Sequence, residues 1–379
     1  MPIQIITIER LCMAPKKKIT KEEVQNIEAD IRLPEPKKEK QMRFISSGST
    51  LLNLALSDRV DGGYLVGSFV NVIGDSSSGK TSAALTMMAE ALRDERFLDY
   101  QVVYDLPEAT MNFDLQTIFG DTFGRVRFLP EDRTVARTIQ DWHHDLYKIT
   151  EKPTIHVTDS FDALTSIGDV KNVEEGSAVA KTGWKTEKAM VSSAAFPQII
   201  GRIEEHDSLL FIISQTRDNI GVTFGPAKKQ SGGNAMVFYR THAIWLSEGQ
   251  KIHVVVREKK REIGHWTHAK VSKNKVTGKI RQISFTVYYD YGIDDIGSCI
   301  EWLVTESFWT ADKKGALDLG DDAERLNLEA DKRIKRDSLI KHIEGENLEK
   351  ELKSITGECW QEIEEEIHRK TSRKPRYSS

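Results

Sequence analysis

The eight residues from Gly74 to Thr81 read Gly-Asp-Ser-Ser-Ser-Gly-Lys-Thr and fit the pattern G-x-x-x-x-G-K-[ST] at every fixed position. An apolar run over residues 69–73 precedes this segment, and a helical pattern over residues 83–92 follows it. A strand, a glycine-rich loop and a helix N-terminus in this order direct backbone N–H groups and the positive end of the helix dipole at a bound phosphate. The segment therefore predicts an α/β fold that binds a nucleoside triphosphate.

Chemistry assigns a role to each end of this loop. Lys80 would neutralise the β- and γ-phosphates, and the Thr81 hydroxyl would bind Mg²⁺. Further along, the apolar residues 155–158 end at Asp159, whose carboxylate would hold the metal ion through water. A turn or cap residue is the alternative interpretation of Asp159. We expect ATP and Mg²⁺ as cofactors, with phosphate contacts from Gly74, Asp75, Ser76, Ser77, Ser78, Gly79, Lys80, Thr81 and Ser82.

Composition limits the other possibilities. The 379 residues, 39 % of them apolar, suffice for one large domain with smaller flanking pieces. A net charge of −4 means that any contacts to nucleic acid must be local. The cysteines Cys12, Cys299 and Cys359 show no metal-ligand spacing and suit a reducing cytoplasm. No apolar run approaches the roughly 20 residues that span a bilayer, so we expect a cytoplasmic protein without membrane contact.

The chain divides into three parts by pattern. Residues 1–43 are polar, with some helical spacing before a proline-bearing linker, and we interpret them as an N-terminal arm. The first dozen residues of this arm lack a signal-peptide pattern and could precede a start at Met13. Residues 44–295 alternate short apolar runs with helical stretches, which predicts a largely parallel sheet with a later antiparallel extension. Residues 296–379 predict a small, mostly helical domain with a basic, disordered tail from residue 369. The apolar runs are residues 69–73, 101–104, 154–158, 209–214, 243–246, 252–256 and 283–289.

A more specific signal lies in the second half of the core. Residues 210–217 read Leu-Phe-Ile-Ile-Ser-Gln-Thr-Arg, and residues 231–235 read Ser-Gly-Gly-Asn-Ala. This run closely resembles the bacterial and phage RecA recombinase family, in which a strand ending in Asn-Gln leads through a mobile DNA-binding loop to Gly-Gly-Asn-Ala. Three further blocks resemble the family in the same order, so that the resemblance covers residues 44–295. They are residues 44–49, 269–275 and 287–294.

The resemblance implies an overall activity. It indicates a RecA-type P-loop ATPase core that forms homo-oligomeric helical filaments on single-stranded DNA, with the N-terminal arm serving oligomerisation. Such a protein would be a DNA-dependent ATPase that pairs this strand with duplex DNA and exchanges strands in recombination and repair. Single-strand-binding and loader proteins are further candidate partners.

The resemblance also implies catalytic and interface residues. Gln215 would sense the γ-phosphate, and Lys273 and Lys275 would reach across a subunit interface to the neighbour's ATP, with Phe238 at the same interface. The family's water-activating carboxylate belongs to an Asp-x-Glu sequence, whereas residues 105–108 of this chain read Asp-Leu-Pro-Glu. Glu108 is therefore the catalytic candidate, and Asp105 remains its alternative.

Two segments would bind DNA. The segment 216–234 takes the place of the second DNA-binding loop, in which Arg217 would pair with a phosphate and Ile220 would wedge between bases. The segment 168–188 takes the place of the first loop by position alone. Solvated lysines and a packing tryptophan are the alternative interpretation. The DNA-binding candidates are Lys181, Trp184, Lys185, Arg217, Asn219, Ile220, Lys228, Lys229, Gly232, Gly233 and Asn234.

Two other functions fit the same motifs. One is a DNA motor of the same fold, such as a ring helicase or a branch-migration ATPase. The other is a weakly hydrolysing RecA paralogue that acts as a DNA-binding or mediator module, an alternative that the altered segment 105–108 keeps open. Ser214 stands where the family usually has Asn, and the tail is basic instead of acidic. Such differences are more typical of phage or plasmid relatives.

Overall fold

The computed structural model describes residues 42–108, 114–131, 137–174, 184–218, 228–230, 233–329 and 332–371. From Arg43 on, the described residues belong to one compact unit. The predicted N-terminal arm over residues 1–43 lies outside the described residues except for its last two. The description below concerns that compact unit.

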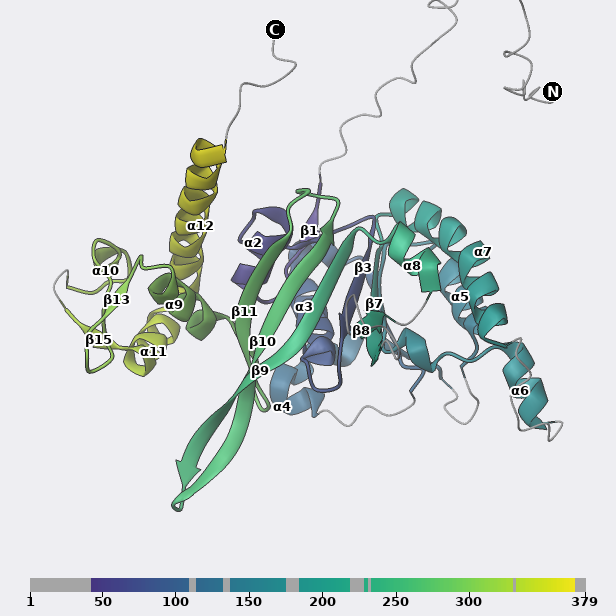
Figure 1. Cartoon of the computed structure of the whole chain (residues 1–379), viewed down its shortest axis with the longest axis horizontal. Helices are drawn as coiled ribbons and strands as arrows, with labels where there is room; N and C mark the ends of the chain where they lie inside the picture. Colours follow the sequence, from purple (N-terminus) through teal and green to yellow (C-terminus); the bar gives the residue numbers. More distant parts are fainter. Residues whose placement is uncertain are drawn as a thin grey trace, which may run out of the picture. The chain divides into compact units, whose positions relative to one another are not determined.

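A ten-stranded mixed sheet forms the centre of this unit (Figure 1). The strand order is β12-β11-β10-β9-β3-β7-β6-β4-β5, and β8 pairs with β7. Pairing is parallel from β9 to β5 and antiparallel from β9 to β12, which confirms the predicted α/β fold and its antiparallel extension. The strands are β3 (Ser68–Gly74), β4 (Gln101–Asp105), β5 (Val126–Leu129), β6 (Thr154–Thr158), β7 (Leu209–Asp218), β8 (Lys228–Gln230), β9 (His242–Val256), β10 (Lys259–Asn274), β11 (Arg281–Tyr288) and β12 (Gly292–Asp294).

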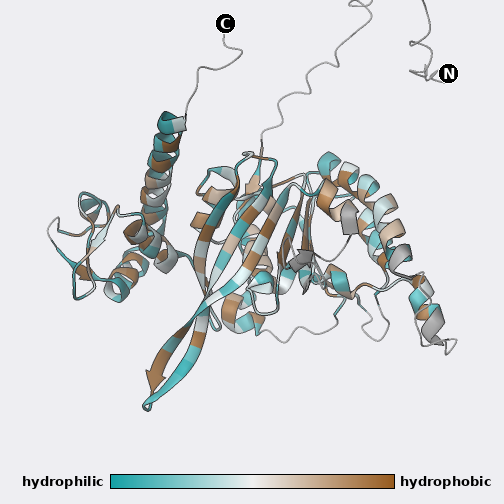
Figure 2. Cartoon of the chain, in the orientation of Figure 1, coloured by the Kyte–Doolittle hydropathy of each residue, from teal (hydrophilic) through white to brown (hydrophobic). Residues whose placement is uncertain are grey.

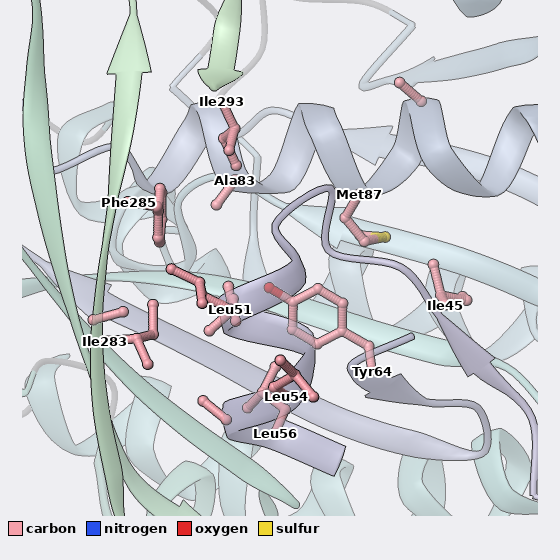
Figure 3. Close-up of a cluster of buried hydrophobic side chains, with 14 of the residues drawn as sticks. Ile45, Leu51, Leu54, Leu56, Tyr64, Ala83, Met87, Ile283, Phe285 and Ile293 are labelled. Carbon is pink, nitrogen blue, oxygen red and sulfur yellow. The ribbon is translucent and has the colours of Figure 1, made fainter. Parts of the chain in front are cut away.

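Helices cover both faces of the sheet, which explains why its strands are nearly continuous apolar runs. Successive side chains of a strand point to opposite faces. Leu210 and Ile212 accordingly share a core with Trp142, whereas Phe211 packs edge-on against Tyr64 with ring centroids 5.5 Å apart. Phe211 and Tyr64 belong to a second core on the other face of the sheet, and Figure 3 shows Tyr64 among its buried side chains. The covering helices are α2 (Thr50–Ser57), α3 (Lys80–Arg93), α4 (Leu115–Phe119), α5 (Ile139–Ile149), α7 (Trp184–Glu205) and α8 (Gly233–Tyr239).

Shorter elements complete this part of the chain. A two-stranded sheet joins β1 (Phe44–Ile45) to β2 (Tyr64–Leu65). The remaining elements are η2 (Glu95–Phe97), η3 (Gly120–Arg125), η4 (Phe161–Ala163) and α6 (Ile167–Glu174). Among the described residues, no helix has both the length and the apolar character needed to cross a membrane.

The C-terminal elements share the core that α2, α3 and β11 form. Cys299, Leu303 and Trp360 belong to it, and Arg281 on β11 forms a 2.6 Å ion pair with Glu364. The last helix runs to Thr371, so the prediction of a disordered tail from Arg369 is wrong for its first three residues. The elements are α9 (Asp295–Thr305), β13 (Thr310–Ala311), β14 (Ala316–Asp318), α10 (Asp322–Arg325), β15 (Ile334–Lys335), α11 (Arg336–Glu346) and α12 (Glu349–Thr371).

Strands β9 and β10 form a ribbon that extends past the rest of the sheet (Figure 1). The sequence pattern suggested two separate runs, 243–246 and 252–256, but the structure has one 15-residue strand. Both turn residues, Arg257 and Glu258, have positive φ angles of 51° and 62°, which suit the right-handed twist of a tight hairpin. Figure 2 shows a hydrophobic strand end paired with a hydrophilic one at this tip. Both faces of the ribbon are exposed there, so its sequence lacks the alternation of apolar and polar residues from which a strand is predicted.

Candidate nucleotide and DNA site

The loop between β3 and α3 has the backbone geometry that phosphate binding requires. Gly79 precedes the helix with φ of 87°, a left-handed conformation that favours glycine. A Cβ atom at Gly74 would lie 2.4 Å from the carbonyl oxygen of Leu246. Both fixed glycines of the motif are thus required by the fold. The loop ends at the N-terminus of a 14-residue helix, whose dipole and N–H groups attract an anion.

Lys80 is buried at the start of α3. Its ammonium group donates a hydrogen bond to the carbonyl oxygen of Asp75 and lies 3.5 Å from the hydroxyl of Ser78. Burial lowers the pKa of Lys80, and the carboxylates of Asp159 and Asp75 oppose this effect. The ammonium group therefore folds back over its own loop, within the cradle that would hold phosphates.

Asp159 follows β6 and is 9 % exposed. Its Oδ2 accepts hydrogen bonds from the Thr81 hydroxyl at 2.8 Å and the Tyr104 hydroxyl at 2.7 Å. Burial raises the pKa of Asp159, whereas these two hydrogen bonds lower it. Hydroxyl and carboxylate oxygens are the ligands that Mg²⁺ prefers, so this pair fits the ion beside a bound phosphate. Sequence reasoning did not single out Tyr104, which appeared only as an apolar strand residue.

Glu108 and Gln215 lie together although they are 107 positions apart in the chain. The Gln215 side-chain amide donates to Glu108 at 3.2 Å, and the Ser160 hydroxyl donates to the same carboxylate oxygen at 2.6 Å. The backbone N–H of Gln215 donates to Asp162 on η4 at 2.6 Å. Gln215 does not end its strand as predicted, because β7 continues to Asp218.

Asp105 is engaged elsewhere. It is fully buried, and Arg137 donates to its carboxylate from Nη2 at 2.8 Å and from Nε at 3.3 Å. Arg137 also binds Asp145 at 2.7 Å. Burial raises the pKa of Asp105, while Arg137 lowers it. The geometry therefore favours Glu108 over Asp105 as the carboxylate that meets a water molecule. No motif in the sequence marks Arg137.

A cleft of about 520 Å³ opens beside the phosphate loop. Aromatic and apolar side chains on the opposite wall could hold a flat base, and polar side chains from the base of the ribbon continue this wall. Sequence reasoning missed the wall, because its residues come from α4 and from the segment β9 to β12, which are far apart in the chain. The cleft is lined by Ser77, Ser78, Gly79, Lys80, Thr81, Ser82, Leu85, Ile118, Phe119, Lys251, Glu262, His265, Val287, Tyr288, Tyr289 and Gly292.

Comparison with known proteins decides the family. A model described as the RecA N-terminal domain matches residues 150–294. Protein RecA of Colwellia psychrerythraea is 30 % identical over 280 residues, which cover 72 % of each chain. This chain belongs to the RecA recombinase family. Protein RecA of Ectopseudomonas oleovorans and of Marinobacter nauticus are each 28 % identical, over 276 and 278 residues and again 72 % of each chain.

Part of the segment predicted as the second DNA-binding loop lies within the described residues. Within the segment 216–234, Thr216, Arg217 and Asp218 at the end of β7 pair with Gln230, Lys229 and Lys228 of β8. The Thr216 hydroxyl donates a hydrogen bond to Asp75 of the phosphate loop. Helix α8 then begins at Gly233. The segment from Thr216 to Asn234 was predicted as a loop, but its first three residues belong to β7, residues 228–230 form β8, and its last two residues begin α8.

Several predicted DNA-binding residues cannot be placed. Lys181, Asn219, Ile220 and Gly232 lie outside the described residues. The side chains of Trp184, Lys185, Arg217, Lys228, Lys229 and Asn234 also lie outside them, although their backbones belong to α7, β7, β8 and α8. Their contacts with DNA remain predictions.

The predicted interface residues of this RecA-family chain gather around α8. Lys273 donates to the carbonyl oxygens of Val237 at 2.9 Å and Phe238 at 3.0 Å, at the carboxyl end of the helix. The Phe238 ring is 71 % exposed, which is unusual for an aromatic side chain. Lys275 is exposed just beyond β10. The carboxyl end of α8 thus carries an uncovered aromatic ring beside the half-buried Lys273.

Proposed function

We propose that this chain is an ATP-dependent homologous recombinase. It forms helical filaments on single-stranded DNA and catalyses homologous pairing and strand exchange with duplex DNA. The observation that carries the proposal is the position of Gln215. Its side chain bonds to the candidate catalytic carboxylate, and its strand runs directly into the DNA-binding segment.

ATP hydrolysis would use the residues around the phosphate loop. The loop N–H groups and Lys80 would bind the β- and γ-phosphates, while Thr81 and Asp159 would hold Mg²⁺. The ion, when bound, neutralises the charge that develops on the phosphates. Glu108 would orient a water molecule toward the γ-phosphate and accept its proton.

Gln215 would couple hydrolysis to DNA. Its amide donates to Glu108 in this structure, and with ATP bound it would donate to a γ-phosphate oxygen as well or instead. Because Asp162 holds its backbone, the change would pass into Thr216 and the β7–β8 pair. Arg217 and the backbone N–H groups at residues 232–234 would then bind DNA phosphates, and Ile220 would separate stacked bases.

The second half of the ATP site would come from a neighbouring protomer. Lys273 and Lys275 would reach the neighbour's γ-phosphate and stabilise the charge of the transition state, as an arginine finger does. Phe238 would be covered in the same interface. Hydrolysis would therefore require assembly on DNA.

We favour an active ATPase over a weakly hydrolysing paralogue because of the position of Glu108. Pro107 adds one residue to the family's Asp-x-Glu spacing, yet Glu108 still meets Gln215 and Ser160. A carboxylate at this position is what water activation needs.

Electron microscopy and ATP turnover together test the proposal. With single-stranded DNA and a non-hydrolysable ATP analogue, the protein should form helical filaments, and DNA should stimulate its ATP turnover. Lys80→Ala should abolish both the filaments and the stimulation. Discrete rings would favour a helicase. A wild-type protein without ATP turnover would favour the weakly hydrolysing paralogue.

A further inference from the structure

His265 lies on the wall of the cleft, next to the part of β10 that contacts the phosphate loop. It stands two residues before Thr267 on β10, and Thr267 touches the loop: its Oγ1 lies 3.5 Å from the carbonyl oxygen of Ser78. A Cβ atom at Gly79 would be 3.0 Å from the same Oγ1. Side chains two residues apart on a strand share a face and lie about 7 Å apart. His265 therefore faces the part of a nucleotide that follows the phosphates.

The ring of His265 is buried and unsatisfied. It is 5 % exposed, and neither Nδ1 nor Nε2 has a hydrogen-bond partner within the described part of the chain. Buried polar groups in native proteins are nearly always paired, so an unpaired group on a cleft wall is available to hydrogen-bond a molecule that enters the cleft. His156 and His242 also carry unpaired buried nitrogens, but neither lines the cleft.

The charged neighbours of His265 are bonded to one another. Glu262 accepts from Lys251 at 2.8 Å and from the Tyr289 hydroxyl, and Lys251 also binds Glu248. Burial lowers the pKa of His265, as does Lys251, whereas Glu248 and Glu262 raise it. The ring is therefore neutral near pH 7 and has one donor and one acceptor nitrogen.

We propose that His265 recognises the sugar of the bound nucleotide through a hydrogen bond to a ribose hydroxyl. A hydroxyl both donates and accepts, as a neutral imidazole does. With the triphosphate at Lys80, the sugar would lie along β10, and the base would lie toward Phe119 and Tyr289. This inference rests on the proposed ATP site and adds a contact to the sugar hydroxyls of the nucleotide.

Titration calorimetry with two ligands tests the inference. The ligands are the β,γ-imido analogues of ATP and of 2′,3′-dideoxy-ATP, with Mg²⁺ and the full chain. Wild type should bind the ribose form about fivefold more tightly, the usual effect of one neutral hydrogen bond. His265→Ala should lose this preference and keep its affinity for the dideoxy form. His253→Ala, on the exposed ribbon, is the matched control and should behave as wild type.

His265→Phe keeps a ring in the wall and removes both nitrogens, so it covers the case in which the alanine variant does not fold. It too should bind both analogues equally. The proposed hydrogen bond to the sugar would be contradicted if wild type bound both analogues with equal affinity. It would also be contradicted if the variants lost the same affinity for both analogues. If wild type bound neither analogue, the proposed ATP site itself would fail, which is a different result.

Discussion

The side-chain amide of Gln215 lies 3.2 Å from the carboxylate of Glu108, at the point where β7 runs on toward the predicted DNA-binding segment. The backbone of the same residue is held by Asp162, three residues beyond the candidate metal ligand Asp159. One residue thus contacts both carboxylate-bearing segments of the ATP site. We therefore expect a change at the γ-phosphate that moves Glu108 to move Gln215 as well.

Replacement of Glu108 tests whether this carboxylate activates water. Glu108→Gln should lower DNA-stimulated ATP turnover by about 100-fold or more and leave ATP affinity unchanged, because a general base contributes about 10²–10⁴-fold. Steady-state turnover and ATP titration measure the two effects. Glu131→Gln, at an exposed carboxylate paired with Arg127, is the control. Turnover within threefold of wild type would assign water activation elsewhere.

Tyr104 should set the acidic limit of activity through Asp159. Burial raises the pKa of Asp159, and the Tyr104 hydrogen bond favours its ionised form, which is the form that would bind Mg²⁺. Tyr104→Phe should therefore raise that pKa and move the acidic limb of the pH–rate profile upward by about one pH unit, with little change near pH 8. Tyr147→Phe, at a partly exposed ring, should leave the limb in place. An unmoved limb in Tyr104→Phe would contradict this role.

Arg137 should matter for stability more than for chemistry. Arg137→Ala leaves the carboxylate of Asp105 buried without its partner, which costs about 3–5 kcal/mol of unfolding free energy. Urea denaturation measures this loss. Arg127→Ala, which breaks an exposed pair with Glu131, should cost about 0–1 kcal/mol.

The pH dependence of the same variant follows from the sign of the shift. Burial already raises the pKa of Asp105, and removal of Arg137 should raise it further. The folded state then binds a proton more tightly than the unfolded state, so stability falls as the pH rises through the folded-state pKa. The deficit of Arg137→Ala should therefore be smaller near pH 5 than near pH 8. A deficit that grows toward acid would contradict the assignment.

Lys273 offers a test of the shared ATP site. Lys273→Ala should abolish DNA-stimulated turnover while the isolated protomer binds ATP as before, because its ammonium group would act on the neighbour's phosphate. In the single chain this group contacts α8 and not the phosphate loop. Lys260→Ala, at the exposed ribbon tip, should change neither property. Loss of ATP binding by the Lys273→Ala protomer would count against action between subunits.

The parts of the site that the sequence predicts best are those whose chemistry is local. Residues 74–81 combine backbone geometry, charge and a candidate metal ligand in eight consecutive positions. The motif alone therefore predicts the phosphate-binding loop and the strand and helix on either side of it. The central strands were predictable because helices bury both of their faces. The Arg137–Asp105 pair joins residues 32 positions apart and was not predictable from local pattern. The cleft wall with His265 depends on the ribbon, whose exposed faces lack a hydrophobic period.

The binding of a fluorescent single-stranded oligonucleotide, followed by anisotropy, tests the central claim most directly. The affinity should be at least about tenfold higher with a non-hydrolysable ATP analogue than with ADP or no nucleotide, which is a typical coupling between two sites. Gln215→Ala should bind the ATP analogue but lose this difference, whereas Gln198→Ala, at an exposed site on α7, should keep it. If wild type held the oligonucleotide equally well under all three conditions, Gln215 would not link the nucleotide to DNA.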